Sequence, residues 1–160
     1  MSANGIIINE IGKLIIDDGD FYIELKEEYK AGIKGLQGFS HIQVLWWCHH
    51  NDTEIYRNNV ECHSAYKTSP EILGTFATRS PFRPNPVGLT ATKVKSIDEE
   101  KGIIHLFYLD ADHESPIIDI KPYHPSVDRV KKVTVPKWCE HWPKWQENSM
   151  VFDWENEFNF

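Results

Sequence analysis

The sequence predicts a mainly β protein built from short antiparallel strands, and three observations carry that prediction. Apolar runs of strand length recur along the chain, and many of their residues are β-branched or aromatic. Clusters of Asp, Asn and Gly separate these runs. A chain of 160 residues suits one domain with a substantial core. The expected strands lie in residues 6–16, 21–25, 41–47, 72–78, 87–97, 102–109 and 116–120.

Turn signals indicate where neighbouring strands connect. The chain reads DDGD at 17–20, NDTE at 51–54 and DEEKG at 98–102. The last of these separates two apolar runs and is the clearest hairpin in the sequence. Short strands with regular breaks of this kind are typical of an all-β sheet or barrel.

Two segments have helical patterns. Residues 26–36 carry acidic residues early and glycines late, as a short helix does. Residues 135–148 place Trp138, Trp142 and Trp145 at spacings of four and three, which puts them on one helical face. Because Pro143 interrupts this pattern, we expect a kink or an early end. The Trp stripe is more typical of core or dimer packing than of a ligand site.

The composition bounds the function. The formal net charge is -7, which argues against binding of nucleic acid by bulk charge and leaves a local basic patch open. Three cysteines cannot all pair within one chain, and no apolar run is long enough for a signal peptide or a membrane span. We therefore expect a reduced, cytoplasmic protein that does not enter a membrane.

The segment ATRSPFRPNPVGL, at 77–89, is the most unusual part of the chain. Its three prolines make it stiff, and it holds Arg79, Arg83 and Asn85 in fixed positions. Arg suits planar capture of a carboxylate or phosphate. Gly88 is expected to take a backbone angle that other residues avoid, or to let a ligand approach closely. Two other interpretations are a rigid connector whose arginines face water, and a P-x-x-P ligand for a Pro-binding domain.

A basic stretch that includes this segment is followed by an acidic one. Residues 72–97 contain four basic residues and no acidic one, whereas Asp110, Asp112, Glu114 and Asp119 lie close together. Asp119 and Lys121 should share one face of a strand, as a structural salt bridge or as part of a site. Two strands that end at prolines and carry opposite charges suggest the two walls of one cleft.

A metal site is not expected. The cysteines and histidines that lie close in sequence lack the usual zinc spacings, and neighbouring strand residues point to opposite faces. These residues are Cys48, His49, His50, Cys62 and His63. The common nucleotide-binding and hydrolase motifs are also absent.

Three long motifs resemble the TrmO family, also known as the YaeB, TsaA-like or VirR family. They are LQGFSHIQVLWWCHH at 36–50, GTFATRSPFRPNPVGLTATKV at 74–94 and SPIIDIKPYHP at 115–125, in the family's order and spacing. The resemblance implies a small β-barrel that is generally a homodimer and uses S-adenosylmethionine without a Rossmann domain. It also implies methylation of the N6 amine of threonylcarbamoyl-adenosine at position 37 of tRNA. The implied domains are a barrel at 1–135 and a Trp-rich helical tail at 136–160 that packs on it.

The resemblance also implies site residues. The matching cofactor contacts are His49, His50, Arg79, Leu89, Asp110, Ala111, Asp112 and His113. The residues expected at the methyl acceptor are Arg83, Asn85, Lys121 and Tyr123. S-adenosylmethionine carries a carboxylate, an ammonium and a sulfonium, so an Arg-bearing loop and an acidic loop complement both signs.

The chemistry implied is methyl transfer to a nitrogen, which rests on alignment and on a base for the amine proton. The candidates for that base, left open by residue type, are Asp110, Asp119, His49 and Tyr123.

Departures from the family pattern keep further functions open. Relatives carry a P-R-Q-P-G-like segment between the first two strands, where this chain runs directly from IGKLIIDDGD to FYIEL. They often read D-G-T-P where this chain has HESP at 113–116, and the tail here is acidic and Trp-rich. A family member acting on a small molecule other than tRNA, and a non-catalytic binding protein, therefore remain alternatives.

Overall fold

The computed structural model describes residues 5–159, which form two compact units. The barrel unit comprises the residues up to Asp52 together with Asn85–Arg129. The aromatic unit comprises Thr53–Pro84 together with the residues from Val130 onward. The chain therefore leaves the barrel unit after Asp52, returns to it at Asn85 and leaves it again after Arg129.

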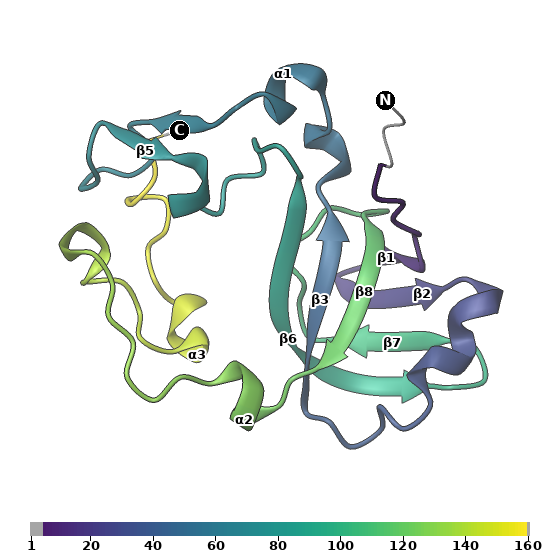
Figure 1. Cartoon of the computed structure of the whole chain (residues 1–160). Helices are drawn as coiled ribbons and strands as arrows, with labels where there is room; N and C mark the ends of the chain where they lie inside the picture. Colours follow the sequence, from purple (N-terminus) through teal and green to yellow (C-terminus); the bar gives the residue numbers. More distant parts are fainter. Residues whose placement is uncertain (1–4, 160) are drawn as a thin grey trace. The chain divides into compact units, whose positions relative to one another are not determined.

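The barrel unit is a closed antiparallel barrel with the strand order β1-β2-β7-β6-β3-β8 (Figure 1). This confirms the expected mainly β fold. Its strands are β1 (Gly12–Asp17), β2 (Asp20–Leu25), β3 (His41–Trp47), β6 (Val87–Asp98), β7 (Ile103–Leu106) and β8 (Pro116–Pro122). Because the barrel is closed, each of its strands has a hydrogen-bonded neighbour on both sides.

Alternation along the strands fills the barrel. Ile42 and Val44 of β3 point inward and are fully buried, while the residues between them face outward. The rest of the core is aliphatic and comes from every strand except β6, which contributes Val94 and Ile97 at its margin. The fully buried members are Leu14, Ile23, Ile42, Val44, Ile104 and Ile117.

Two tight turns join neighbouring strands as predicted. Asp18 and Gly19 both have positive φ, 46° and 82°, between β1 and β2. Gly102, with φ of 71°, precedes β7, and its N–H donates to the carbonyl of Asp98. The predicted hairpin at DEEKG is thus confirmed.

Two expectations for the N-terminal part were only partly right. The first strand begins at Gly12, and the expected strand residues Ile6 and Ile7 are highly exposed. The expected helix at 26–36 is a single 3-10 helix, η1 (Glu27–Ile33), which buries Ile33 against the core. Two further short helices of this unit are η2 (His49–Asn51) and α2 (Pro125–Asp128).

The aromatic unit contains only short elements. They are α1 (Glu54–Arg57), β4 (Glu61–His63), β5 (Ile72–Gly74), η3 (Thr75–Ala77), η4 (Lys137–Cys139) and α3 (Gln146–Ser149). β4 and β5 pair with each other in a two-stranded sheet. The core of this unit consists of aromatic side chains. The Tyr66 ring stacks on Trp138 at 5.2 Å between centroids and meets Trp142 edge-on at 5.0 Å.

The predicted helix at 135–148 is wrong. The segment holds only η4 and the start of α3, because prolines at 136 and 143 break the pattern. Trp138 and Trp142 do pack together, at 5.3 Å between ring centroids, whereas Trp145 is 65% exposed. Trp138 and Trp142 therefore pack in the core of this unit, as expected. The helix that was predicted to bring them together is absent from this described segment.

No helix in the described part of the chain is long and apolar enough to cross a membrane.

Candidate functional site

The end of the barrel where β3 stops gathers most of the predicted cofactor residues. The Cys48 N–H donates to the carbonyl of Pro86 at 2.8 Å, so the chain after β3 stays paired with the chain before β6. η2 follows at once and carries His49 and His50, whose rings lie 3.8 Å apart. The position of the two histidines is thus fixed by the barrel and by the last proline of the PNPVGL motif.

His49 connects this end of β3 to the loop between β7 and β8. Its Nδ1 lies 3.3 Å from the Ser115 hydroxyl, and Ser115 is fully buried. The Ser115 N–H in turn donates to the carbonyl of Asp112 at 3.1 Å. The structure therefore brings His49 next to the predicted cofactor stretch that includes Asp112.

The same loop is tied to β1. The Ile16 N–H donates to Nδ1 of His113 at 3.0 Å, and the Glu114 N–H donates to the carbonyl of Leu14 at 2.7 Å. Glu114 has φ of 64°, the left-handed region that usually favours glycine. Glu114 is the second residue of HESP, the position at which the resemblance leads us to expect a glycine, and it adopts the conformation for which glycine is suited.

Asp110 begins the acidic loop. Its carboxylate accepts a hydrogen bond from the Tyr108 hydroxyl at 3.2 Å, and the carbonyl of Tyr108 accepts one from the Thr92 hydroxyl on β6. Burial raises the pKa of Tyr108, and the charge of Asp110 adds to that rise. Tyr108 therefore stays a neutral hydrogen-bond donor at physiological pH, and Asp110 stays its acceptor.

Leu89 lies on β6 and pairs with Leu45 of β3 on the outer face of the barrel. Its side chain is 43% exposed, so it offers an apolar surface three residues beyond Pro86. Gly88, next to it, does not have positive φ. A Cβ at this position would collide with the Trp46 indole. The glycine is needed for the close approach of Trp46 and not for an unusual backbone angle.

Lys121 and Tyr123 lie toward the other end of β3. The Tyr123 N–H donates to the carbonyl of His41, the first residue of β3, whereas His49 follows its last residue. Seven strand residues at about 3.3 Å each separate these ends by about 20 Å. Of the four candidate bases, Tyr123 is thus distant from the His49 end, and Asp110 lies in the loop that His49 approaches.

Asp119 and Lys121 share one face of β8, as predicted, and form an ion pair of 2.7 Å. Both residues are partly or largely exposed, and the ion pair raises the pKa of Lys121. β6 and β8 pair with β3 on its two sides, so the three strands lie in one continuous sheet.

The basic residues of β6 have partners elsewhere in the barrel. Lys95 pairs with Asp20 of β2 at 2.8 Å, and the Lys93 ammonium lies 4.8 Å from the centre of the Phe107 ring. Among the described ion pairs, none joins Lys93 or Lys95 to the acidic loop at 110–114. Both basic side chains of β6 thus have partners within the barrel unit, and the two-sided cleft stays a prediction.

Of the residues predicted in the proline-rich segment, Arg79 and Arg83 belong to the aromatic unit. Asn85 is the first residue of the second part of the barrel unit. Arg79 is exposed and follows η3 by two residues. Nη2 of Arg83 donates to the carbonyls of Thr75 and Thr78, at 3.0 and 2.8 Å. The carbonyl of Asn85 accepts a hydrogen bond from the Val87 N–H.

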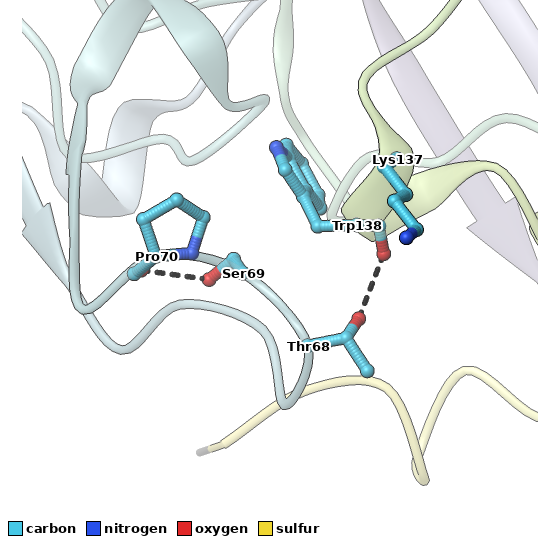
Figure 2. Close-up of a pocket in the computed structure, with 5 residues that line it drawn as sticks. All are labelled: Thr68, Ser69, Pro70, Lys137 and Trp138. Atoms are coloured by element: carbon cyan, nitrogen blue, oxygen red, sulfur yellow. Dashed lines mark hydrogen bonds between the residues drawn. The ribbon is translucent and has the colours of Figure 1, made fainter.

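A shallow hollow of about 500 Å³ lies on the aromatic unit (Figure 2). Thr68, Ser69, Pro70, Lys137 and Trp138 line it, and the Thr68 hydroxyl donates to the carbonyl of Trp138 at 2.7 Å. None of the site residues predicted from the sequence lies in this hollow. In the part of the chain that the structure describes, no three His, Cys, Asp or Glu side chains are grouped as a metal site.

A closed antiparallel barrel whose candidate ligand groups lie on loops at one end defines a class of small β-barrel binding proteins. The adenosyl-binding sheet of a Rossmann enzyme, with its parallel strands and helical crossovers, is a different architecture. Here every strand pairing within the barrel is antiparallel.

The chain belongs to the TrmO family: the family model described as the tRNA-methyltransferase O N-terminal domain matches residues 13–129. A probable S-adenosyl-L-methionine-binding protein of Methanocaldococcus jannaschii is 36% identical over 116 residues, covering 71% of this chain and 90% of that protein. The human tRNA (adenine(37)-N6)-methyltransferase is 37% identical over 109 residues, covering 65% of this chain and 22% of that protein.

Solved structures agree on the fold. The crystal structure of TrmO from Pseudomonas aeruginosa superposes with a TM-score of 0.61 at 22% identity. The match covers 81% of this chain and 61% of that one, so this chain spans about three fifths of the crystallised protein. At this level of identity the superposition supports the barrel architecture and not the details of the site.

Proposed function

We propose that the protein binds S-adenosylmethionine and methylates the N6 amine of an adenosine at position 37 of tRNA. The observation that carries the proposal is the grouping of His49 and the 110–113 loop at one barrel end. These are the positions at which the family resemblance places cofactor contacts. Both lie inside the segment that the family model matches.

The chemistry of these groups fits the cofactor. The carboxylates of Asp110 and Asp112 suit its ammonium and sulfonium charges, and the exposed Leu89 side chain suits an adenine face. His50 and Ala111 complete the two segments, and the resemblance separately implies a cofactor contact for Arg79, whose guanidinium suits a carboxylate. Bound S-adenosylmethionine supplies an activated methyl group.

The chain's own residues orient the acceptor amine and take up its proton. Asp110 and His49 are the base candidates that lie at or beside the acidic loop. Asp119 is engaged with Lys121 midway along β8. Lys121, Tyr123 and Asn85 remain proposals as contacts to the nucleic acid.

The charges of the two units bear on how tRNA would dock. The barrel unit carries nine Lys or Arg and sixteen Asp or Glu, whereas the aromatic unit carries eight of each. All of the net negative charge therefore lies on the barrel unit. Recognition would rest on local contacts and on the adenosine itself rather than on a basic surface.

Two further parts of the proposal concern assembly and location. We expect a homodimer, as the resemblance implies, and the exposed apolar side chain of Phe107 is compatible with a covered surface. Light scattering of the purified protein would give twice the chain mass of 18.6 kDa. We expect a cytoplasmic location because the odd number of cysteines suits a reducing compartment.

The function is tested in two steps. Calorimetric titration with S-adenosylmethionine should show binding, and incubation with threonine tRNA should add one methyl group to the modified adenosine, as measured by mass spectrometry of nucleosides. Binding without methylation would favour the alternative of a small-molecule methyltransferase or a non-catalytic binding protein. The archaeal relatives described only as binding S-adenosylmethionine are the observation that keeps this alternative.

A further inference from the structure

The loop that carries Arg79 is held from within by a second arginine. The carbonyls of Thr75 and Thr78, which both accept hydrogen bonds from Nη2 of Arg83, enclose the 3-10 turn immediately before Arg79. One guanidinium nitrogen thus bridges the first residue of the turn and the residue just after it. Hydrogen bonds from a charged donor are stronger than those from a neutral one, so this bridge fixes the turn firmly.

The threonines reinforce the same turn. Thr75 and Thr78 are 1% and 8% exposed, and the Thr78 hydroxyl donates to the carbonyl of Thr75 at 2.9 Å. The Thr78 hydroxyl also accepts the N–H of Ser80 at 3.2 Å. Hydrogen bonds therefore tie down the residues on both sides of Arg79.

Arg79 itself is anchored through its main chain. Its N–H donates to the hydroxyl of Tyr66, a bond that acts against the rise in the pKa of Tyr66 caused by burial. The Tyr66 ring stacks on Trp138 and contacts Phe158 at 5.7 Å between centroids. The aromatic cluster of this unit thus supports the Arg79 main chain.

The guanidinium of Arg83 faces the loop interior. Its Nε is buried, and within the described residues it has no hydrogen-bond partner. A buried N–H without a partner is costly, so this arrangement persists only because the other bonds of the group hold it. Nε is out of reach of a ligand, which favours a role in shaping the loop over a direct contact.

We propose that Arg83 is a positioning residue that, with Tyr66, fixes the direction in which Arg79 presents its guanidinium to the carboxylate of S-adenosylmethionine. This inference rests on the proposed function, since that function supplies the ligand of Arg79. It assigns Arg83 to the shape of the loop and not to the methyl acceptor. It also gives the Trp-rich C-terminal segment a function, as the support of a binding loop.

The test compares two ligands that differ only at the carboxylate. Calorimetry gives the dissociation constants of S-adenosylmethionine and of decarboxylated S-adenosylmethionine for the wild type and for Arg83→Met, which keeps the stem and removes the donors. We expect S-adenosylmethionine to bind roughly tenfold more weakly to Arg83→Met, and the decarboxylated ligand to change less than about twofold. Arg79→Ala should show the same pattern, and the double variant should be no weaker than Arg79→Ala alone.

Matched variants guard against a general loss of structure. Tyr66→Phe keeps the ring cluster and removes the hydroxyl, so it should weaken S-adenosylmethionine by roughly threefold with little effect on the decarboxylated ligand. Arg129→Met, the same change at an exposed position of the barrel unit, should leave both constants unchanged.

Four outcomes would overturn the inference. An equal loss for both ligands would mean that Arg83 only supports the fold, and additive losses in the double variant would mean that Arg83 touches the carboxylate itself. Unchanged binding in Arg83→Met, with weaker binding in Arg79→Ala, would remove Arg83 from the site. If the wild type binds neither ligand, the proposed function itself fails, and the inference fails with it.

Discussion

The barrel unit and the aromatic unit are stabilised by different interactions. The barrel closes on itself through a continuous ladder of main-chain hydrogen bonds around a fully buried aliphatic core. The aromatic unit has one pair of three-residue strands, and ring contacts and side-chain bonds to carbonyls do the rest. A ladder surrounding a dense core gives a rigid frame, whereas a cluster of rings positions loops individually.

This contrast has a functional consequence. The barrel determines where the chain ends of β3 and β6 lie, and thus where His49 and Leu89 are placed. The aromatic unit determines how a single exposed loop, with Arg79, is presented. Substitutions in the barrel should therefore be felt mainly as lost stability, and those in the aromatic unit should affect local geometry first.

The largest expected effect is in the barrel core. Ile42→Ala removes a fully buried side chain of β3 and should lower the free energy of unfolding by about 4 kcal/mol, measured by chemical denaturation. The control is Ile55→Ala in the aromatic unit, where the side chain is 81% exposed and the change should stay within about 0.5 kcal/mol. A loss below about 1 kcal/mol for Ile42→Ala would mean that the core collapses around the cavity.

The next effect concerns the close approach on β6. Gly88→Ala places a methyl group against the Trp46 indole, which donates to the Thr90 hydroxyl at 3.2 Å and is not free to move. We expect a loss of about 2 kcal/mol in the free energy of unfolding. Gly74→Ala in the aromatic unit is the matched control, because a Cβ there meets no atom within 4 Å. Equal stabilities of the two variants would contradict this account.

The sequence predicted the barrel far better than the aromatic unit. Strand alternation, turn residues and the hairpin at DEEKG are local signals, so β2, β3 and β6 appear close to their expected bounds. The closed order of the strands follows from pairing across long distances, and it came from the family resemblance rather than from periodicity.

The aromatic unit depends on contacts that no local pattern reports. Tyr66 lies in a segment without a strand or helix signal, yet it meets three aromatic residues from the C-terminal segment. The spacing of Trp138 and Trp142 predicted a helix, whereas their contact with Tyr66 and with each other is tertiary.

The candidate site shows the same limit. Its loops were predicted from motifs, but the bond between His49 and Ser115 joins residues 66 positions apart. The resemblance implies a place for Arg83 at the methyl acceptor, whereas its guanidinium donates to carbonyls of its own loop, and a sequence does not tell which way a side chain turns.

A smaller effect tests the electrostatics of the aromatic unit. Glu157 accepts hydrogen bonds from Nε1 of Trp142 at 2.9 Å and approaches Nε2 of His141 at 2.8 Å, and these contacts hold its pKa below the ordinary 4.5. Because the pKa is lowered on folding, the stabilisation is complete above that ordinary value and is lost as the pH falls through the lowered one.

Glu157→Gln should therefore flatten the dependence of the melting temperature on pH between about pH 5 and pH 3. Glu155→Gln, at a nearby exposed position, should leave the wild-type dependence in place. Identical acid profiles for wild type and Glu157→Gln would show that the bonds to Trp142 and His141 do not favour the ionised carboxyl.

The smallest expected effect is on the outer face of the barrel, where Lys121 and Asp119 form an ion pair that water screens. Lys121→Met should change the melting temperature by only about 1 °C at neutral pH, and less in 1 M salt. Because the pair raises the pKa of Lys121 above its ordinary 10.5, any contribution is present at neutral pH and is lost as the pH rises through the raised value.

Asp119→Asn should give the same small change, and the double variant should be no less stable than either single variant. A shift of several degrees would instead mean that side chains outside the barrel share in holding it together, and the contrast between a core-stabilised barrel and a contact-stabilised second unit would have to be given up.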